Sequence, residues 1–315
     1  MEDILKLRQA YLDNPCFETR IDLVSELIRS GTDAKLKGEA DWLQKSYDAF
    51  TEATELSEQS YSECPCYISR QKLAYSYMKL ADASRSKVGK ISREDVLELY
   101  FKAQELLEQN FQENPCYDSR RYMSALYGRL ADINVTSGKP EKVAIAKEMY
   151  LKKLTLDEEN CKEKPCEGER SILLGTYEKL AEIAKSAGTH EALNEAEQWY
   201  RKMLVVAWEK YSDNPKYDRA SEFNNVYNML AETAEKKRTP EGIEEAERWL
   251  LKAAAFREKV FEENPTKHIA RMALVHAYHR LVQFEKRKGT PESKEKASMW
   301  NKKINEAINK PLKKQ

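Results

Sequence analysis

Glycine and proline are scarce in this chain, at ten residues each in 315, and neither charge is in excess. Lysine plus arginine equals aspartate plus glutamate at 53 each, which argues against a general nucleic-acid or anionic-membrane binder. No window approaches the ~18 consecutive apolar residues that a membrane span requires. Charged residues make up 34% of the chain, above the roughly 25% of ordinary domains. This composition suits exposed helices joined by ion pairs.

The first residues, Met1-Glu2-Asp3-Ile4, lack the basic and apolar regions of a secretory signal. We therefore expect a cytoplasmic protein. Neither a nucleic acid nor a membrane is an expected partner of a chain with balanced charge.

One prolyl junction, clearest as Asn114-Pro115-Cys116, returns every fifty residues along the chain. Its prolines are Pro15, Pro65, Pro115, Pro165, Pro215 and Pro265. A fixed period of this length is typical of a repeat protein, in which each repeat contacts chiefly its neighbours. We predict a single solenoid over 1–315, with a partial cap helix at 1–14 and repeats at 15–64, 65–114, 115–164, 165–214, 215–264 and 265–315. The alternative for 1–14 is the end of a longer polypeptide.

Apolar residues at helical spacing predict two helices in every repeat. In the third repeat the first helix should begin near Asp118 or Ser119, either of which can cap it. Gly138 and Pro140 then mark a stop and a new start. In the first repeat we expect a helix ending near Gly31 and a longer one from about 39 to 61. Columns of matching residues run through the repeats: Tyr77, Tyr127, Tyr177 and Tyr227; Leu80, Leu130, Leu180 and Leu230; Ala81, Ala131, Ala181 and Ala231; and Tyr100, Tyr150, Tyr200 and Leu250.

Cysteine and histidine offer little chemistry at these spacings. Cys16, Cys66, Cys116 and Cys166 recur at one repeat position, and stacked helices ~8–10 Å apart would hold them beyond the ~7 Å Cα limit of a disulfide. Cys64-Pro65-Cys66 lacks the CxxC spacing of zinc ribbons, and His276 and His279 have no cysteine near them in sequence. We expect no metal, no cofactor and no enzymatic activity. A local Cys161–Cys166 disulfide and a Cys–His catalytic pair are the alternatives.

The chain resembles the tetratricopeptide repeat (TPR) family, in a bacterial variety with extended repeats of about 50 residues. The resemblance is carried by the pair Leu180-Ala181, a glycine seven residues later (Gly188), Ala196 opening the second helix, Tyr200 and the closing Pro215. It covers nearly the whole chain and departs from the family's usual ~34-residue period. It implies an all-α fold, a right-handed α-α superhelical solenoid of stacked antiparallel helix pairs.

The resemblance also implies that first helices line a concave face that binds a partner protein or peptide. Counting by three and four from each Leu-Ala pair selects the candidate contacts Tyr75, Met78, Asp82, Gly128, Asp132, Gly175, Glu178, Glu182, Asn225, Asn228 and Glu232. Four of them form an acidic column, Asp82, Asp132, Glu182 and Glu232. This column suits an extended ligand with basic groups and disfavours the family's clamp for a carboxyl-terminal peptide, which uses basic residues and asparagines.

Three features of this face have a structural explanation beside the functional one. Lys79, Arg129 and Lys179 lie three residues before an acid, so the column can be a set of i,i+3 ion pairs. Gly128 and Gly175 lie inside helices, where a glycine costs ~1 kcal/mol relative to alanine. Either close helix packing or a groove widened for a ligand would explain them. Arg20, Arg70, Arg120 and Arg170 form a further column, continued with slips by Arg219 and Arg271, for which we expect ion pairs between repeats.

The function that these patterns favour is a scaffold that binds a peptide, helix or loop of a partner protein. One alternative is a regulatory sensor of signalling peptides. Another is a self-associating structural module from a larger protein. The sequence indicates no particular partner.

Overall fold

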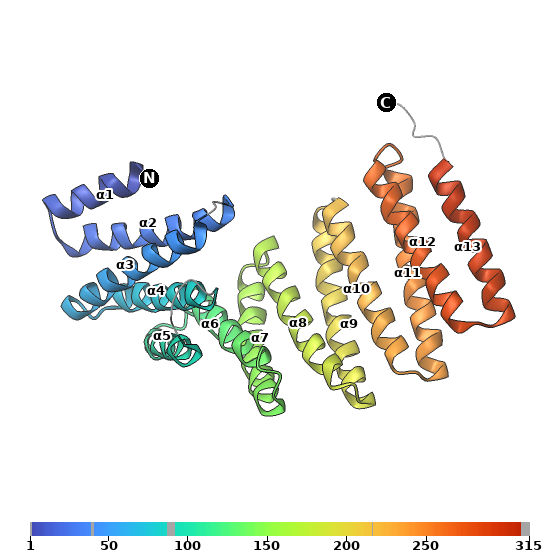
Figure 1. Ribbon diagram of the computed structural model, residues 1–315, viewed down its shortest axis with the longest axis horizontal. Coiled ribbons are helices and arrows are strands. Elements are labelled where there is room, and N and C mark those ends of the chain that lie inside the picture. Colours follow the sequence, from blue (N-terminus) through green and yellow to red (C-terminus); the bar gives the residue numbers. More distant parts are fainter. Residues whose placement is uncertain (1, 39–40, 87–91, 216, 310–315) are drawn as a thin grey trace. The chain divides into compact units, whose positions relative to one another are not determined.

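Thirteen α-helices and no strand make up the described part of the computed structural model, which covers residues 2–38, 41–86, 92–215 and 217–309 (Figure 1). Among these residues, no helix combines the length and the apolar character needed to cross a bilayer. The predicted all-α fold of stacked helix pairs is confirmed. The start predicted near Glu39 for the second helix of the first repeat lies outside the described residues.

Two compact units divide the chain. The N-terminal unit, Met1–Glu163, holds α1 (Glu2–Asp13), α2 (Phe17–Leu36), α3 (Trp42–Glu63), α4 (Tyr67–Arg85), α5 (Arg93–Glu113), α6 (Tyr117–Val135) and α7 (Pro140–Glu163). The C-terminal unit, Lys164–Gln315, holds α8 (Glu167–Ala187), α9 (His190–Asp213), α10 (Tyr217–Lys236), α11 (Pro240–Glu263), α12 (His268–Lys288) and α13 (Pro291–Asn309). That all repeats join in one solenoid stays a prediction.

Helices pair as the fifty-residue period predicts. The most extensive contacts join α2 to α3, α4 to α5, and α6 to α7 in the N-terminal unit, and α8 to α9, α10 to α11, and α12 to α13 in the C-terminal unit. Each of these pairs lies within one predicted repeat. The first helix of the first repeat is longer than predicted, because α2 continues past Gly31 to Leu36.

The prolyl junctions are tight turns that connect one repeat to the next. At Pro65 the Cys66 amide donates to the Cys64 carbonyl at 2.8 Å, and at Pro115 the Cys116 amide donates to Asn114 at 2.8 Å. The cysteine then takes the N-cap position, so α6 begins at Tyr117 and not at Asp118 or Ser119. Ser119 is instead the third residue of α6, and its hydroxyl donates a hydrogen bond back to the Asn114 carbonyl at 2.7 Å.

The arginine column closes each hairpin, which corrects the expected pairing between repeats. Arg20 at the start of α2 donates to Glu63 at the end of α3 at 2.7 Å. In the same way Arg70 pairs with Glu113, Arg120 with Glu163 and Arg170 with Asp213. Because each arginine meets an acid 43 residues later in its own repeat, the two helices of a hairpin run antiparallel. Arg271 donates to the Ile308 carbonyl at 3.1 Å, while the side chain of Arg219 lies outside the described residues.

The repeated columns form the core of each unit. Ala81 and Ala131 are completely buried, and so are Ala181 and Leu180. Tyr100 and Tyr200 are the largest side chains with no exposed surface. The alanines of the first helices let these tyrosines of the second helices pack closely. All six cysteines are free thiols.

Candidate functional site

The predicted contacts of the N-terminal unit lie on α4 and α6, and Asp82 is the best held of them. Its carboxylate accepts a hydrogen bond from the Tyr100 hydroxyl at 2.7 Å. Arg129 Nε, one repeat further on, donates to both carboxylate oxygens at 2.9 and 3.0 Å. Two donors therefore hold Asp82 through three hydrogen bonds, which gives it a structural role between α4, α5 and α6.

Asp132 repeats part of this arrangement, because it accepts a hydrogen bond from the Tyr150 hydroxyl of α7. The expected i,i+3 pairs do not form at Arg129, whose guanidinium reaches back to Asp82 instead. Lys79 lies over the ring of Tyr75, with Nζ 5.3 Å from the centroid. In the N-terminal unit Asp82 thus joins neighbouring repeats, whereas Asp132 joins the two helices of its own hairpin.

Met78 is fully buried, which corrects its prediction as a ligand contact. It packs in the core cluster that also contains Leu73, Tyr100 and Leu107. Tyr75 is half-buried and packs edge-on against Tyr122 of α6, with ring centroids 5.5 Å apart.

Gly128 makes room for a neighbouring lysine. A Cβ at this position would lie 3.3 Å from Cδ of Lys153 on α7. The Lys153 ammonium then reaches Asp157 at 2.7 Å and the Ser124 hydroxyl at 3.0 Å. Close packing therefore accounts for Gly128.

Gly175 on α8 is different, because no atom beyond its own helix lies within 4 Å of where a Cβ would stand. Glu178 and Glu182 follow it at a spacing of three and four residues, so all three share one face of α8. Glu178 is half-buried and Glu182 is exposed. The predicted contacts of the C-terminal unit thus begin with an open stretch of helix that carries two carboxylates.

The charges of these carboxylates act on Tyr200 of α9. Burial raises the pKa of Tyr200, and the negative charges of Glu182, Glu178 and Glu232 raise it further. Three predicted residues from α8 and α10 therefore act on one buried phenol through their charge, and we call them the Tyr200 cluster: Glu178, Glu182 and Glu232. Lys185 donates to the Tyr200 hydroxyl at 3.3 Å.

Glu178 is in an unfavourable place for a charge. Burial raises its pKa, and the neighbouring carboxylates Glu182 and Glu222 raise it further, while Lys179 and Lys185 act in the opposite direction. Acidification therefore neutralises Glu178 at a higher pH than an ordinary glutamate. A cation placed beside Glu178 and Glu182 would relieve this repulsion.

At one position of the acidic column, the residue in register on the next repeat carries no charge. Asp82 meets Arg129, and Glu232 meets Arg280 of the next repeat at 2.8 Å. The spacing of 47 residues that joins Asp82 to Arg129 leads from Glu182 to Met229, which carries no charge. Among the described residues, none gives Glu182 an ion pair or a hydrogen bond.

Asn225 and Asn228 lie on α10, the helix that also carries Met229 and Glu232. Asn225 is exposed and Asn228 is half-buried. Glu232 lines a cavity of about 210 Å³ with Arg280 and Arg287, and Arg287 makes two hydrogen bonds to Glu235 at 2.7 and 2.9 Å. The arginines on α12 thus neutralise this end of the face.

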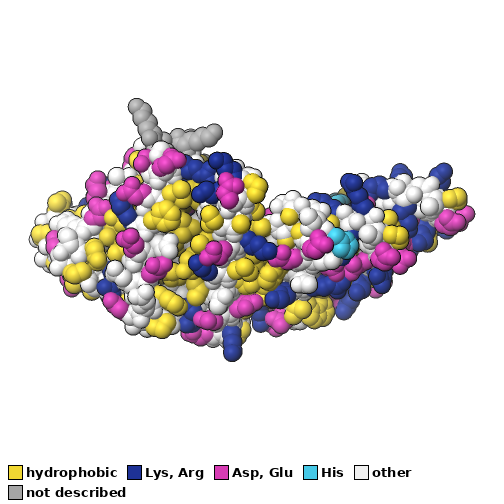
Figure 2. All heavy atoms as spheres, turned by 90° about the horizontal axis from the view of Figure 1, so that it is seen from below, with side chains coloured by type: hydrophobic (Ala, Val, Ile, Leu, Met, Phe, Trp, Pro, Cys, Tyr) yellow, Lys and Arg dark blue, Asp and Glu magenta, His cyan; other side chains and the backbone are white. Residues whose placement is uncertain are grey.

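The sequence pattern identified the acidic residues but not the arginines that form ion pairs with them. The missing signal was the spacing that joins Arg129 to Asp82 and Arg280 to Glu232, because each of these arginines pairs with the preceding repeat's acid and not with its own. On the surface drawn in Figure 2, acidic and basic side chains are intermingled. In the described residues, no group of three or more His, Cys, Asp or Glu side chains is arranged to hold a metal ion.

Comparisons with known proteins agree with this architecture. No family model matches the chain, and no curated protein sequence matches it. Among solved structures, the hypoxic regulator of sterol synthesis Nro1, described as a nuclear import adaptor, matches 98% of this chain and 93% of its own with a TM-score of 0.56 and 10% identity. A structure of Nro1 from S. pombe matches 83% of this chain and 82% of its own, with a TM-score of 0.54 and 13% identity.

A third structure is the signal-transduction ATPase with a tetratricopeptide repeat sensor from Pyrococcus horikoshii. It matches 98% of this chain and 47% of its own, with a TM-score of 0.45 and 14% identity. The likeness to Nro1 and the hairpin architecture together define an α-helical repeat protein of TPR-like fold.

Proposed function

We propose that the chain is a scaffold that binds an extended segment of a partner protein on the first-helix face of its C-terminal unit. A lysine or arginine of that segment lies against Glu178 and Glu182, beside Gly175. Asn225 and Asn228 offer amide groups to the backbone of the segment. The function is binding without catalysis.

One observation carries this proposal: Glu182 is the member of the acidic column whose register position on the next repeat holds an apolar residue, Met229. Where the next repeat supplies an arginine, as it does for Asp82 and Glu232, the carboxylate already forms an ion pair. The likeness to Nro1 supports a repeat scaffold as a class. Asp82, Asp132, Gly128 and Tyr75 have structural roles here, and we leave Met78 out of the proposed contacts.

Two finer points of classification are also proposed. The fifty-residue period, with both helices of a hairpin about twenty residues long, favours an extended, bacterial variety of TPR protein. The cytoplasmic location stays a prediction from the sequence.

A random peptide library selected on the purified chain tests the proposal. Enriched peptides should carry lysine or arginine, and the double variant Glu178→Gln/Glu182→Gln should bind them about tenfold more weakly, since each partly exposed ion pair contributes up to ~1 kcal/mol. Isothermal titration gives the affinities. Glu295→Gln, an exposed carboxylate of α13, is the matched control and should leave them unchanged.

Two outcomes of that selection would sink the proposal. One is a set of enriched peptides without basic residues. The other is equal affinity for the wild-type chain and the double variant.

A further inference from the structure

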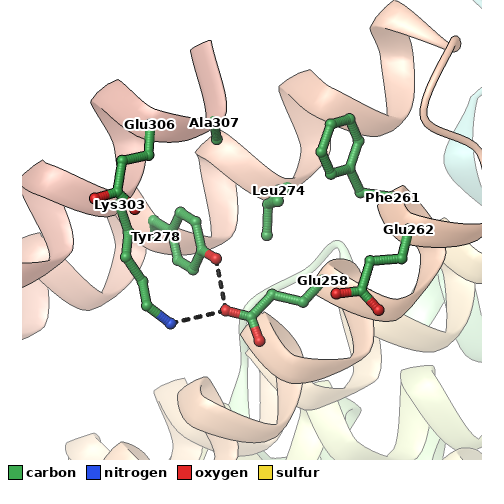
Figure 3. A pocket seen from close by; sticks show the side chains of 8 residues that line it. All are labelled: Glu258, Phe261, Glu262, Leu274, Tyr278, Lys303, Glu306 and Ala307. Carbon is green, nitrogen blue, oxygen red and sulfur yellow. Dashed lines mark hydrogen bonds and ion pairs between the residues drawn. The ribbon is translucent and has the colours of Figure 1, made fainter. Parts of the chain in front are cut away.

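A second hollow lies in the C-terminal unit, away from the Tyr200 cluster, where α11, α12 and α13 meet (Figure 3). Its volume is about 240 Å³. Three apolar residues, Phe261, Leu274 and Ala307, line it together with the charged or polar side chains Glu258, Glu262, Tyr278, Lys303 and Glu306. We call it the α13 pocket.

The polar side of the α13 pocket is partly satisfied by its own residues. The Tyr278 hydroxyl donates to Glu258 at 2.6 Å, and the Lys303 ammonium donates to the same carboxylate oxygen at 3.0 Å (Figure 3). Lys303 also lies over the rings of Tyr278 and Trp300, with Nζ 5.5 and 5.0 Å from their centroids. Lys303 and Glu258 therefore neutralise each other and form one wall.

The other repeats fill the equivalent space with a large side chain. The positions that correspond to Ala307 carry Leu106, Leu156, Val206 and Phe256. Leu106 and Leu156 are buried in the core of the N-terminal unit. In the preceding repeat the Phe256 ring lies 5.2 Å from Tyr211 and 4.8 Å from Phe223, the counterparts of Phe261 and Leu274. The pocket therefore exists because alanine replaces a bulky residue at 307.

Two carboxylates appear at the pocket together with the alanine. The positions that correspond to Glu262 carry Ser62, Gln112, Lys162 and Ser212, and those that correspond to Glu306 carry Glu105, Thr155, Val205 and Ala255. Both acids are exposed, and both charges add to the burial and the Glu258 hydrogen bond that raise the pKa of Tyr278. No other repeat combines the two acids with the small residue.

We propose that the α13 pocket binds a protonated primary amine on an aliphatic stem. The stem takes the space that Ala307 leaves, against Phe261 and Leu274, and the ammonium is held by the carboxylate of Glu262, while Glu306 adds a negative charge from the opposite side of the hollow (Figure 3). A butylammonium ion has five heavy atoms and takes up about 150 Å³ at ~30 Å³ each, which fits the hollow. Drug-sized ligands need pockets of about 300–1,000 Å³ and are too large.

The same chemistry is available from a free alkylamine and from a lysine side chain of a peptide. The probes are therefore n-butylamine, a lysine peptide blocked at both ends, and the same peptide with norleucine in place of lysine. n-Butanol tests whether the charge matters. Heteronuclear NMR of the full chain follows binding through the amide and methyl signals around Ala307, at low ionic strength.

The expected result is saturable binding of butylamine that n-butanol lacks. Ala307→Leu, which restores the residue of Leu106 and Leu156, should abolish it without loss of fold. Glu262→Gln/Glu306→Gln should weaken it about fivefold, as for one exposed ion pair of up to ~1 kcal/mol. Glu295→Gln on the same helix should leave it unchanged. Binding of the lysine peptide but not the norleucine peptide assigns a peptide source, and binding of butylamine alone assigns a free amine.

Equal binding of butylamine by Ala307→Leu and by the wild-type chain would overturn the proposal, and so would equal binding of n-butanol. The Glu178→Gln/Glu182→Gln variant separates this site from the proposed peptide-binding face, because it should bind butylamine at the α13 pocket as the wild-type chain does.

Discussion

Met78→Ala is expected to lower the free energy of unfolding by about 2–4 kcal/mol, because it empties space in the core of the N-terminal unit. Met78 has no exposed surface and packs with Leu73, Tyr100 and Leu107. Little of the cavity can close again, since these neighbours belong to two helices fixed by the hairpin contacts. Chemical denaturation followed by far-UV circular dichroism measures the change.

Ile68→Ala is the matched control on the same helix, α4. Its side chain is 49% exposed, so the substitution should cost less than about 0.5 kcal/mol. Equal destabilisation by the two variants would contradict the placement of Met78 in the core.

Lys153→Ala is expected to destabilise the chain by about 2–4 kcal/mol, because it leaves the carboxylate of Asp157 buried without its cation. The side chain of Asp157 is 2% exposed and that of Lys153 is 14% exposed, with 2.7 Å between the charged atoms. The hydroxyl of Ser124 still donates to Asp157, which keeps the loss below the ~5 kcal/mol upper end for a broken buried pair. The same denaturation experiment measures it.

The neighbouring lysine gives the control for this second variant. Lys152 is 48% exposed and pairs with Glu148 one turn earlier at 2.9 Å. An exposed i,i+4 pair contributes only ~0.2–0.5 kcal/mol, so Lys152→Ala should be nearly neutral. If Lys153→Ala lowered the free energy of unfolding no more than Lys152→Ala does, the contacts of Lys153 with Asp157 and Ser124 would not stabilise the fold.

The architecture followed from the sequence because the repeat gives the same local signal many times. The proline at each junction and the alanine and tyrosine columns all indicate helices of one length in one order. The predicted helix start was less accurate at Cys116, because the N-cap position there holds a cysteine, which makes no side-chain capping hydrogen bond and is not among the usual capping residues. A single copy of the motif would have left these points open.

The candidate site could be predicted only in part, because the partners of its charges lie on other repeats. Asp82 and Glu182 occupy equivalent positions in their repeats. Arg129 forms an ion pair with Asp82, whereas the equivalent position on the repeat after Glu182 holds Met229. Likewise, Gly128 and Gly175 look alike in the sequence, yet only Gly128 has a neighbour, Lys153, in the space that a Cβ would take. Distinguishing such pairs needs the contacts between helices that are about fifty residues apart.

The most direct test of the proposed peptide-binding face introduces a basic residue at position 229, which is in register with Glu182 on the next repeat. Met229→Arg gives this carboxylate the partner that Asp82 finds in Arg129, and Met229→Leu is the neutral control. Titration calorimetry with a basic peptide selected on the wild-type chain measures the affinity. The account predicts about tenfold weaker binding to Met229→Arg, unchanged binding to Met229→Leu and no loss of stability in either variant. Unchanged affinity in a well-folded Met229→Arg variant would contradict it.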